Sequence, residues 1–223
     1  MIESATGTWN SCNCDVSTDS NMIMYRQAIL DDVDEMAEVD AVSWPKALAA
    51  SPETIANRVS VFASGQWVAV LDDHIVGSAF AQRLSPHQLE SQPLTYDTMT
   101  DHGTFQRTHL STGSIYQLVS VGVGTAARRS GCGRGLIRRQ IDFAQQLEGI
   151  TRIVGFTRPV RFFRFPQFSI EEYLERCFTA GDVTDPVLSF HRDLGARVVS
   201  THSGFRTDDH ESRGFGVLIE YPA

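Results

Sequence analysis

One segment of the sequence combines glycine, arginine and small side chains at a spacing suited to binding phosphate. Glycine lets the backbone approach an anion closely, and arginine donates paired hydrogen bonds to phosphate oxygens. An apolar strand pattern precedes the segment and a helical pattern follows it, so unpaired N–H groups at the helix start should face the same anion. The segment is therefore predicted to bind a pyrophosphate group. The residues are Arg128, Arg129, Ser130, Gly131, Cys132, Gly133, Arg134 and Gly135.

The spacing within this segment excludes two common nucleotide-binding patterns. It is not Gly-x-Gly-x-x-Gly, and no Gly-Lys-Ser/Thr follows it. It resembles instead the coenzyme A (CoA) motif of the GNAT N-acetyltransferase superfamily, Gln/Arg-x-x-Gly-x-Gly/Ala, with Arg128, Gly131 and Gly133 at the motif positions. The stretch 188–197 resembles the later helix and turn of that family, and the resemblance extends over about residues 24–221.

This resemblance implies an α/β protein with the GNAT fold, in which a mixed, mostly antiparallel central sheet has helices on both faces. It also implies acetyl-CoA or another acyl-CoA as co-substrate, with the backbone of Val121 and Val123 beside the pantetheine arm and the reacting oxyanion. The expected reaction is N-acyl transfer, in which an acetyl or other short acyl group passes from acyl-CoA to the amine of a small molecule.

Two positions that commonly transfer protons in this family differ here. The Tyr that often protonates the leaving thiolate is replaced by His191, whose imidazole titrates near neutrality. The usual Glu base falls on Gln117, whose carboxamide takes no proton at neutral pH and is expected to orient substrate or water. His191 and Gln117 are therefore the catalytic candidates, although a surface histidine without a role remains the alternative for His191. Further candidates for the base are Tyr116, His109, His102, Asp40 and Glu38.

A second basic segment, residues 158–165, alternates Arg with Phe. Such a mixture can bind a planar or anionic acceptor, or the CCA end of an RNA, by stacking and phosphate contacts. Alternatively the Phe side chains pack beneath a loop while the Arg side chains are solvated. The second interpretation is favoured because aromatic side chains are mostly buried.

Composition and charge limit the class of protein. The chain has 223 residues, and we expect a flexible tail at 1–21 and one GNAT acyltransferase domain at 22–223 with a loop and helix inserted at 159–184. The net charge of −8 disfavours nonspecific nucleic-acid binding. The apolar runs are too short to cross a bilayer and no secretory signal is evident, so a cytoplasmic protein is expected. Cys12 and Cys14 lack a second ligand pair, and no metal is predicted.

Several alternatives remain open at this point. The same fold could use a different donor, either an aminoacyl-tRNA or an acyl-carrier protein, and tRNA is the one nucleic-acid partner considered. It could also be a non-catalytic module that binds acyl-CoA. The sequence does not decide whether the protein forms a homodimer.

The elements that must position these residues follow from apolar periodicity and capping residues. Strands are predicted at 22–26, 66–71, 75–82, 114–123, 152–157, 197–201 and 215–221, with the last two antiparallel and a bulge permitted at Gly122. Helices are predicted after a cap at Asp31 or Asp32 as far as Pro45, and at 51–62, 132–147, 169–178 and 185–194. Residues 84–112 are predicted to form a long loop.

Overall fold

The computed structural model describes residues 22–222, so the predicted tail with Cys12 and Cys14 lies outside the described residues. Its strands form one seven-stranded sheet in the order β1-β2-β3-β4-β5-β7-β6. Neighbouring strands are antiparallel except β4 and β5, which are parallel. The expected mixed, mostly antiparallel sheet is confirmed. The strands are β1 Met24–Gln27, β2 Trp67–Leu71, β3 His74–Leu84, β4 Ile115–Val123, β5 Arg152–Thr157, β6 Arg197–His202 and β7 Gly216–Tyr221.

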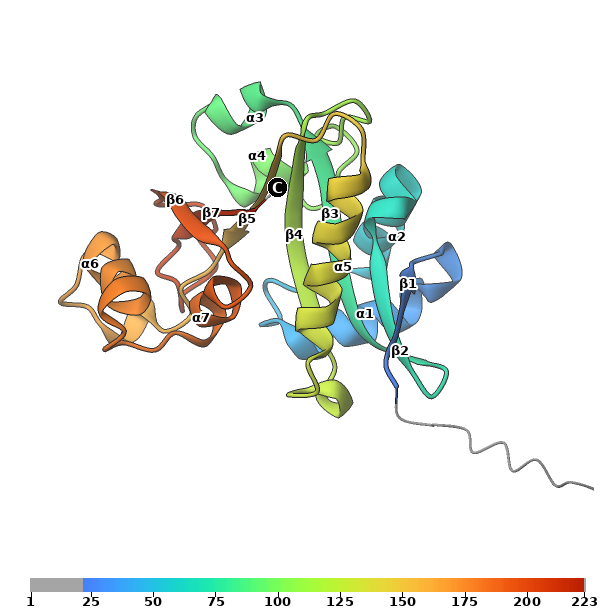
Figure 1. Cartoon of the computed structure of the whole chain (residues 1–223), viewed down its shortest axis with the longest axis horizontal. Helices are drawn as coiled ribbons and strands as arrows, with labels where there is room; N and C mark the ends of the chain where they lie inside the picture. Colours follow the sequence, from blue (N-terminus) through green and yellow to red (C-terminus); the bar gives the residue numbers. More distant parts are fainter. Residues whose placement is uncertain (1–21, 223) are drawn as a thin grey trace, which may run out of the picture.

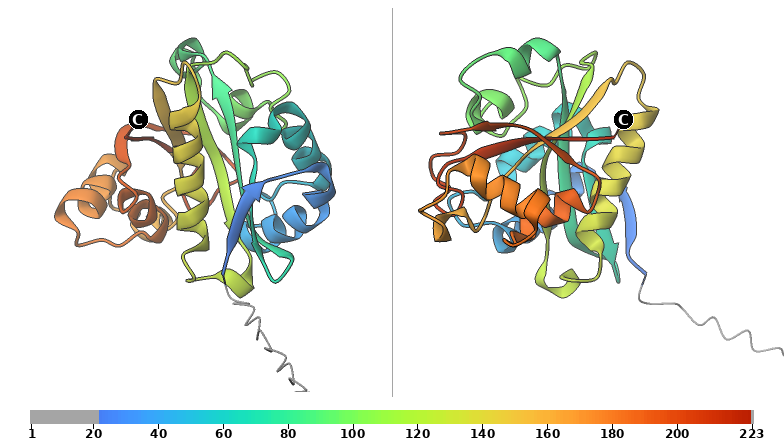
Figure 2. Two further views of the ribbon diagram at one scale, coloured as in Figure 1. Left: turned by 45° about the vertical axis from the view of Figure 1, so that its right-hand side comes forward. Right: turned by 60° about the vertical axis from the view of Figure 1, so that its left-hand side comes forward.

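Helices cover both faces of the sheet (Figures 1 and 2). Helix α5, Cys132–Gln146, packs Leu136 against one face of the N-terminal strands. Helices α1, Val33–Ser43, and α2, Pro52–Phe62, bury Met36 and Ile55 against the other face. The remaining helices are short: α3 Pro86–Glu90, α4 Tyr96–Thr100, α6 Ile170–Glu175 and α7 Pro186–Arg192.

The parallel strands β4 and β5 part halfway along β4. Strand β5 pairs with β4 only over Ile115–Leu118, whereas β3 stays paired with β4 as far as Val123. The register slips between Phe80 and Ala81, which leaves Val119 as an extra residue on β4. The second half of β4 therefore has a free edge on the side of β5.

The bulge predicted at Gly122 is wrong, because the register slip lies three residues earlier in β4. Gly122 instead allows helix α1 to approach the sheet closely. A Cβ at this position would lie 3.1 Å from the Ser43 hydroxyl oxygen. The glycine thus serves the contact between helix and strand rather than the bend of the strand.

Two further local predictions need correction. Residues 84–112 are more than a loop, because they contain α3 and α4, each begun by a Ser or Thr capping box. Neither Asp31 nor Asp32 caps α1 with its side chain. The carboxylate of Asp32 instead accepts hydrogen bonds from the Arg26 guanidinium at 2.6 and 2.7 Å, and from Ile29 N, before the 3₁₀ turn that leads into α1, at 2.8 Å. By contrast, the Ser51 cap of α2 is confirmed, since its hydroxyl accepts from Thr54 N at 3.2 Å.

The Arg/Phe segment at 158–165 only partly follows the favoured interpretation of buried Phe and solvated Arg side chains. Phe162 is 1% exposed and packs against Tyr173, which confirms burial, but Phe163 remains 45% exposed. Arg158 is not solvated, because its guanidinium pairs with Asp209 at 2.5 Å and also contacts Glu211. The segment therefore ties the end of β5 to the loop between β6 and β7.

Candidate functional site

A cavity of about 380 Å³ lies where β4 and β5 part. One part of its wall comes from α5 and α7, through Gly133, Ile137 and Phe190. Another part comes from α1 and the residue that follows it, on the opposite face, through Asp40 and Trp44. The cavity therefore passes through the sheet, and its largely apolar wall with few polar groups is typical of a small-molecule site.

The start of α5 opens beside this cavity in a left-handed turn. Arg129 has φ +66° and Gly131, the N-cap of α5, has φ +87°, a region that glycine adopts without strain. A Cβ on Gly131 would meet nothing within 4 Å, so the space before the helix is open. The backbone N–H groups of Gly133 and Arg134 have no partner among residues 22–222. Two free N–H groups at a helix start suit a phosphate oxygen.

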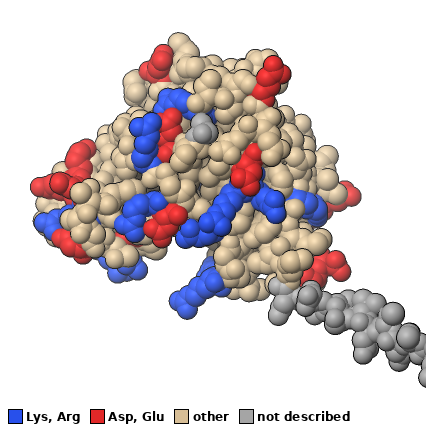
Figure 3. Space-filling view, in the orientation of Figure 1, with Lys and Arg blue, Asp and Glu red and all other residues tan. Residues whose placement is uncertain are grey.

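Arginine side chains surround this helix start. Figure 3 shows basic side chains gathered over α5 and the loop before it. The Arg128 guanidinium donates to Val42 O at 2.8 Å, and Arg134 donates to Asp193 O at 3.2 Å, which leaves each with further N–H groups. Arg129 is exposed and has no side-chain partner in the described part of the chain. The loop therefore retains donors for an anion.

Three of the residues predicted to bind the donor also have a structural reason for their type. The Ser130 hydroxyl donates to Ala127 O at 2.7 Å and accepts from Cys132 N at 3.2 Å, which shapes the turn. The Cys132 thiol is buried against Gly77, and burial raises its pKa to about 11. Gly135 leaves room for the Tyr25 ring, which a Cβ at this position would displace. These three residues shape the loop, and its backbone and arginines remain the groups predicted to contact a ligand.

The backbone of β4 offers further donors on its free edge. Gly124 N donates to Val76 O at 2.8 Å, which turns that N–H toward β3. Since N–H groups alternate in direction along a strand, those of Val121 and Val123 turn away from β3, toward the gap left by β5. Both residues line the cavity. Their placement agrees with the predicted contact to a pantetheine arm or an oxyanion, which stays a prediction.

His191, near the end of α7, also lines the cavity. Its Nδ1 lies 2.5 Å from the Tyr221 hydroxyl oxygen. Tyr221 is 2% exposed and its O–H has no other partner among the described residues, so we assign the hydroxyl as the donor and Nδ1 as the acceptor. The proton of the ring is then on Nε2, which is left for a bound molecule. Burial lowers the pKa of His191 to about 4, and the imidazole is therefore neutral at pH 7.

Sequence reasoning missed several polar residues of the cavity, and three of these have an unpaired polar atom. The side-chain polar atoms of Trp44, Ser120 and Thr157 are buried without a hydrogen-bond partner among residues 22–222. Thr157 is the last residue of β5, and ligands collect beyond the carboxyl ends of parallel strands where neighbours separate. A parallel pairing of β4 with β5, had it been predicted, would have drawn attention to it. Unpaired buried groups are rare, and each is a candidate partner for a ligand.

Charged groups gather at the end of the cavity near α1. Arg206, from the loop between β6 and β7, donates to Leu48 O at 2.8 Å and lies 4.0 Å over the Tyr96 ring. Its Nε and Nη1 have no partner within the described residues. Asp40 is 2% exposed, accepts from Ala50 N at 2.6 Å, and has its pKa raised by burial. Arg206 was not anticipated from the sequence.

Of the candidate bases, Asp40 alone lines the cavity. The Tyr116 hydroxyl is buried against Gln140 of α5. His109 stacks on Phe62 and accepts from Arg83 N at 3.1 Å, away from the cavity. His102 is exposed beside Asp97, and Glu38 is exposed on α1. Gln117, the other catalytic candidate, does line the cavity.

The parted strands, the glycine-led start of α5 and the cavity between them define a GNAT fold. The solved structure of the GphF GNAT-like decarboxylase in complex with isobutyryl-CoA matches 89% of this chain and 98% of its own with a TM-score of 0.77 and 28% identity. The loading GNATL domain of CurA from Lyngbya majuscula matches 90% of this chain and 98% of its own with a TM-score of 0.80 and 24% identity.

A sequence relative agrees with these structures. The uncharacterized N-acetyltransferase YkwB of Bacillus subtilis is 26% identical over 179 residues, which cover 80% of this chain and 77% of that protein. No protein-family profile matches the chain. Sequence and structure together support the GNAT superfamily of acyltransferases for this chain. The acyl-CoA bound in the GphF structure supports acyl-CoA as the co-substrate.

Within residues 22–222, no group of three or more His, Cys, Asp or Glu side chains is placed to hold a metal ion. In the same range, no helix has both the length and the apolar character needed to cross a membrane.

Proposed function

We propose that the protein binds an acyl-CoA at the start of α5 and decarboxylates a 2-carboxyacyl thioester, of which malonyl-CoA is the simplest. The observation that carries this proposal is the set of polar groups that line the cavity. It comprises hydrogen-bond donors, the incompletely paired guanidinium of Arg206 and the carboxylate of Asp40, around a largely apolar wall. Such a cavity complements a carboxylate and a developing oxyanion. The naming of the GphF relative as a GNAT-like decarboxylase supports the same reaction class.

The reaction breaks the bond between C2 and the free carboxylate carbon. Its electron pair moves onto the thioester, giving an enolate, and the carboxylate leaves as CO₂. C2 then takes a proton from water, and an acyl-CoA one carbon shorter remains. The enolate oxygen carries the negative charge that the site must stabilise, and hydrogen-bond donors directed at it lower the activation barrier. His191 Nε2–H and the Thr157 hydroxyl are the donors proposed for this oxygen.

Arg206 has a different role in this scheme. A guanidinium holds a carboxylate by paired, charge-assisted hydrogen bonds, so Arg206 selects substrates that carry a free carboxylate. Such a contact exists in the bound substrate and weakens as CO₂ forms. It therefore lowers KM and does not raise kcat.

Turnover of malonyl-CoA by the wild-type protein tests the proposal directly. We expect CO₂ and acetyl-CoA to form in equal amounts, without any amine, because no acceptor takes part in the reaction. The measurement is chromatography of the CoA esters together with trapping of labelled CO₂. Release no faster than in buffer, with both malonyl- and methylmalonyl-CoA, contradicts decarboxylation.

A second candidate is the N-acyl transfer expected from the sequence, with a small-molecule amine as acceptor. Asp40 favours it, because a buried carboxylate with a raised pKa in the cavity wall can act as a general base. Release of free CoA thiol from acetyl-CoA that depends on an added amine supports this reaction over decarboxylation. Activity restricted to a carrier-protein thioester or an aminoacyl-tRNA supports the alternative donors, and tight acyl-CoA binding without turnover supports a binding module.

The donor site is tested separately with Arg129→Ala. Arg129 has free N–H groups beside the helix start, so its removal takes away a charge-assisted contact to the pyrophosphate. We expect the Kd for acetyl-CoA, measured by calorimetry, to rise by about 10- to 100-fold. The Kd for acetyl-pantetheine, which lacks the pyrophosphate, should stay the same. Arg164→Ala, an exposed Arg over Phe163, is the matched control, and equal behaviour of the two variants would refute this placement.

A further inference from the structure

Gln117 has an amide end whose role nothing in the fold explains. It lies on β4, is 2% exposed, and lines the cavity. Its Oε1 accepts from Gln82 Nε2 at 2.7 Å, but its Nε2 has no partner among residues 22–222. Unlike the hydroxyl of Thr157, this nitrogen is not completely buried, so it keeps an open side at the cavity and is available to a bound molecule.

The orientation of this amide is determined by its neighbours. Gln82 donates to Met99 O at 2.6 Å, and because a carbonyl oxygen only accepts, the Gln82 nitrogen must face it. Its second N–H then meets Gln117, which must present oxygen to it. Turning the Gln117 amide over would set two N–H donors against each other. Gln117 therefore shows a donor, and not an acceptor, to the cavity.

The chain of hydrogen bonds begins in the segment between β3 and β4. The Thr108 hydroxyl donates to Gln82 Oε1 at 2.7 Å, which completes a buried relay from Thr108 through Gln82 to Gln117. Thr108 is itself held through its backbone, since its carbonyl accepts from Gln88 Nε2 at 2.9 Å. The relay is thus anchored at both the strand and the loop.

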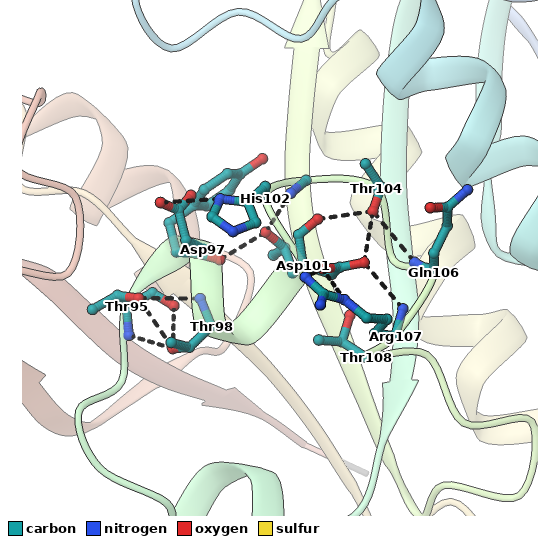
Figure 4. Close-up of polar contacts among 12 residues, drawn as sticks. Thr95, Asp97, Thr98, Asp101, His102, Thr104, Gln106, Arg107 and Thr108 are labelled. Carbon is teal, nitrogen blue, oxygen red and sulfur yellow. Dashed lines mark hydrogen bonds and ion pairs between the residues drawn. The ribbon is translucent and has the colours of Figure 1, made fainter.

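The loop that carries Thr108 is internally braced. Figure 4 shows Asp101 at the centre of a polar cluster with Thr104 and Arg107. The Asp101 carboxylate accepts from Arg107 Nε at 2.7 Å and from the Thr104 hydroxyl at 3.0 Å. Buried Arg58 of α2 donates to Gly103 O at 2.7 Å and so fastens the loop to the body of the protein. A braced loop holds the donor of Gln117 in one direction.

From these contacts we propose that Gln117 determines substrate specificity by donating a hydrogen bond to the free carboxylate of the acyl group. This inference rests on the proposed decarboxylation and extends it. Gln117 and Arg206 both line the cavity, and Gln117 supplies a neutral donor with a fixed direction. An acetyl group has no oxygen beyond its thioester and cannot use this donor. Gln117 is thus a positioning residue for carboxylated acyl groups.

Gln117→Glu tests the proposal with almost no change in shape. The carboxylate can still accept from Gln82, so the relay is kept, but an anionic oxygen replaces the donor that faces the cavity. In a His191→Phe background, which limits turnover during titration, we expect the Kd for malonyl-CoA to rise at least about tenfold. The Kd for acetyl-CoA should change less than about threefold, since that ligand makes no contact here.

Two companion variants separate positioning from packing. Gln117→Met removes the donor without adding charge, and Gln82→Met leaves Gln117 in place but releases its orientation. Both should raise the KM for malonyl-CoA in an otherwise wild-type protein and leave the acetyl-CoA Kd unchanged, with Gln82→Met the milder. These two variants also serve if Gln117→Glu does not fold. Equal losses for both ligands, or no loss for malonyl-CoA, overturn the role of Gln117.

Failure of this inference is distinguishable from failure of the proposed function. If the wild-type protein releases CO₂ from malonyl-CoA and the Gln117 variants keep its KM, Gln117 is not a specificity residue although the decarboxylase remains. If the wild-type protein neither releases CO₂ nor binds malonyl-CoA more tightly than acetyl-CoA, the proposed function is wrong and the role of Gln117 is refuted with it.

Discussion

Replacing His191 by Phe should lower kcat for CO₂ release from malonyl-CoA by about 100- to 1,000-fold, the usual cost of removing one donor to an oxyanion. The ring nitrogen that faces the cavity is lost, whereas an aromatic ring of similar size still fills the place beside Phe190 and Tyr221. The Kd for acetyl-CoA should stay within about threefold of wild type, because the proposed phosphate contacts lie at the start of α5. Stopped-time assays of labelled CO₂ and calorimetry measure the two quantities.

The pH dependence of the wild-type enzyme gives an independent check on the same residue. Burial lowers the pKa of His191 to about 4, so the neutral ring with its Nε2–H persists from pH 5.5 to pH 8. Over that interval we expect kcat to show no titration near the ordinary histidine pKa of about 6.5. Protonation begins only as the pH falls toward 4, where the Nδ1 contact with Tyr221 must rearrange. A rate that titrates near 6.5 and loses this step in His191→Phe contradicts the buried, neutral ring.

His74→Phe is the matched control for His191→Phe, since His74 is an exposed histidine at the start of β3. It should leave both kcat and the acetyl-CoA Kd unchanged. Tyr221→Phe removes the partner of Nδ1 and frees the ring to change tautomer, so it should give a smaller loss than His191→Phe. If His191→Phe retains wild-type turnover, the ring has no part in the reaction.

Arg206→Met should raise the KM for malonyl-CoA by about 10- to 100-fold, the range for a lost hydrogen bond to a charged group. Its guanidinium uses one donor on Leu48 O and leaves Nε and Nη1 for a ligand. Because the contact is made with the bound carboxylate, kcat should fall much less than KM rises. Steady-state kinetics over a range of malonyl-CoA concentrations separates the two effects.

The Arg206 result needs controls for the stability of its loop, because the side chain also stacks on Tyr96. Arg206→Lys keeps the charge without the planar fork and should fall between wild type and Arg206→Met. Arg213→Met removes another guanidinium of the same loop, one that lies over Phe162 outside the cavity, and should not change KM. A KM unchanged in Arg206→Met, with the thermal midpoint preserved, refutes carboxylate binding by this residue.

Much of the secondary structure was predictable because its causes are local. The Ser51-Pro52 start of α2 and the Ser169–Glu172 capping box lie where predicted, since a capping side chain bonds to an amide two or three residues away. Strand β4 and helix α5 were predicted to within two residues from apolar periodicity and the glycine turn. The position of the bulge and the start of α1 were not predicted correctly. The bulge at Val119 depends on pairing with β3, and the Asp32 side chain binds Arg26.

By itself, the sequence determined where the phosphorylated donor should bind, because strand, glycine turn and helix start are consecutive. It also placed His191 and Gln117 among the candidates. Only the tertiary structure shows that Thr157 and Arg206 line the same cavity. It also shows the contact between Tyr221 and Nδ1 of His191, from which we place the ring proton on Nε2. These residues come from separate elements, and their meeting depends on how far β4 and β5 part. That separation follows from packing across the whole sheet, and no short stretch of sequence encodes it.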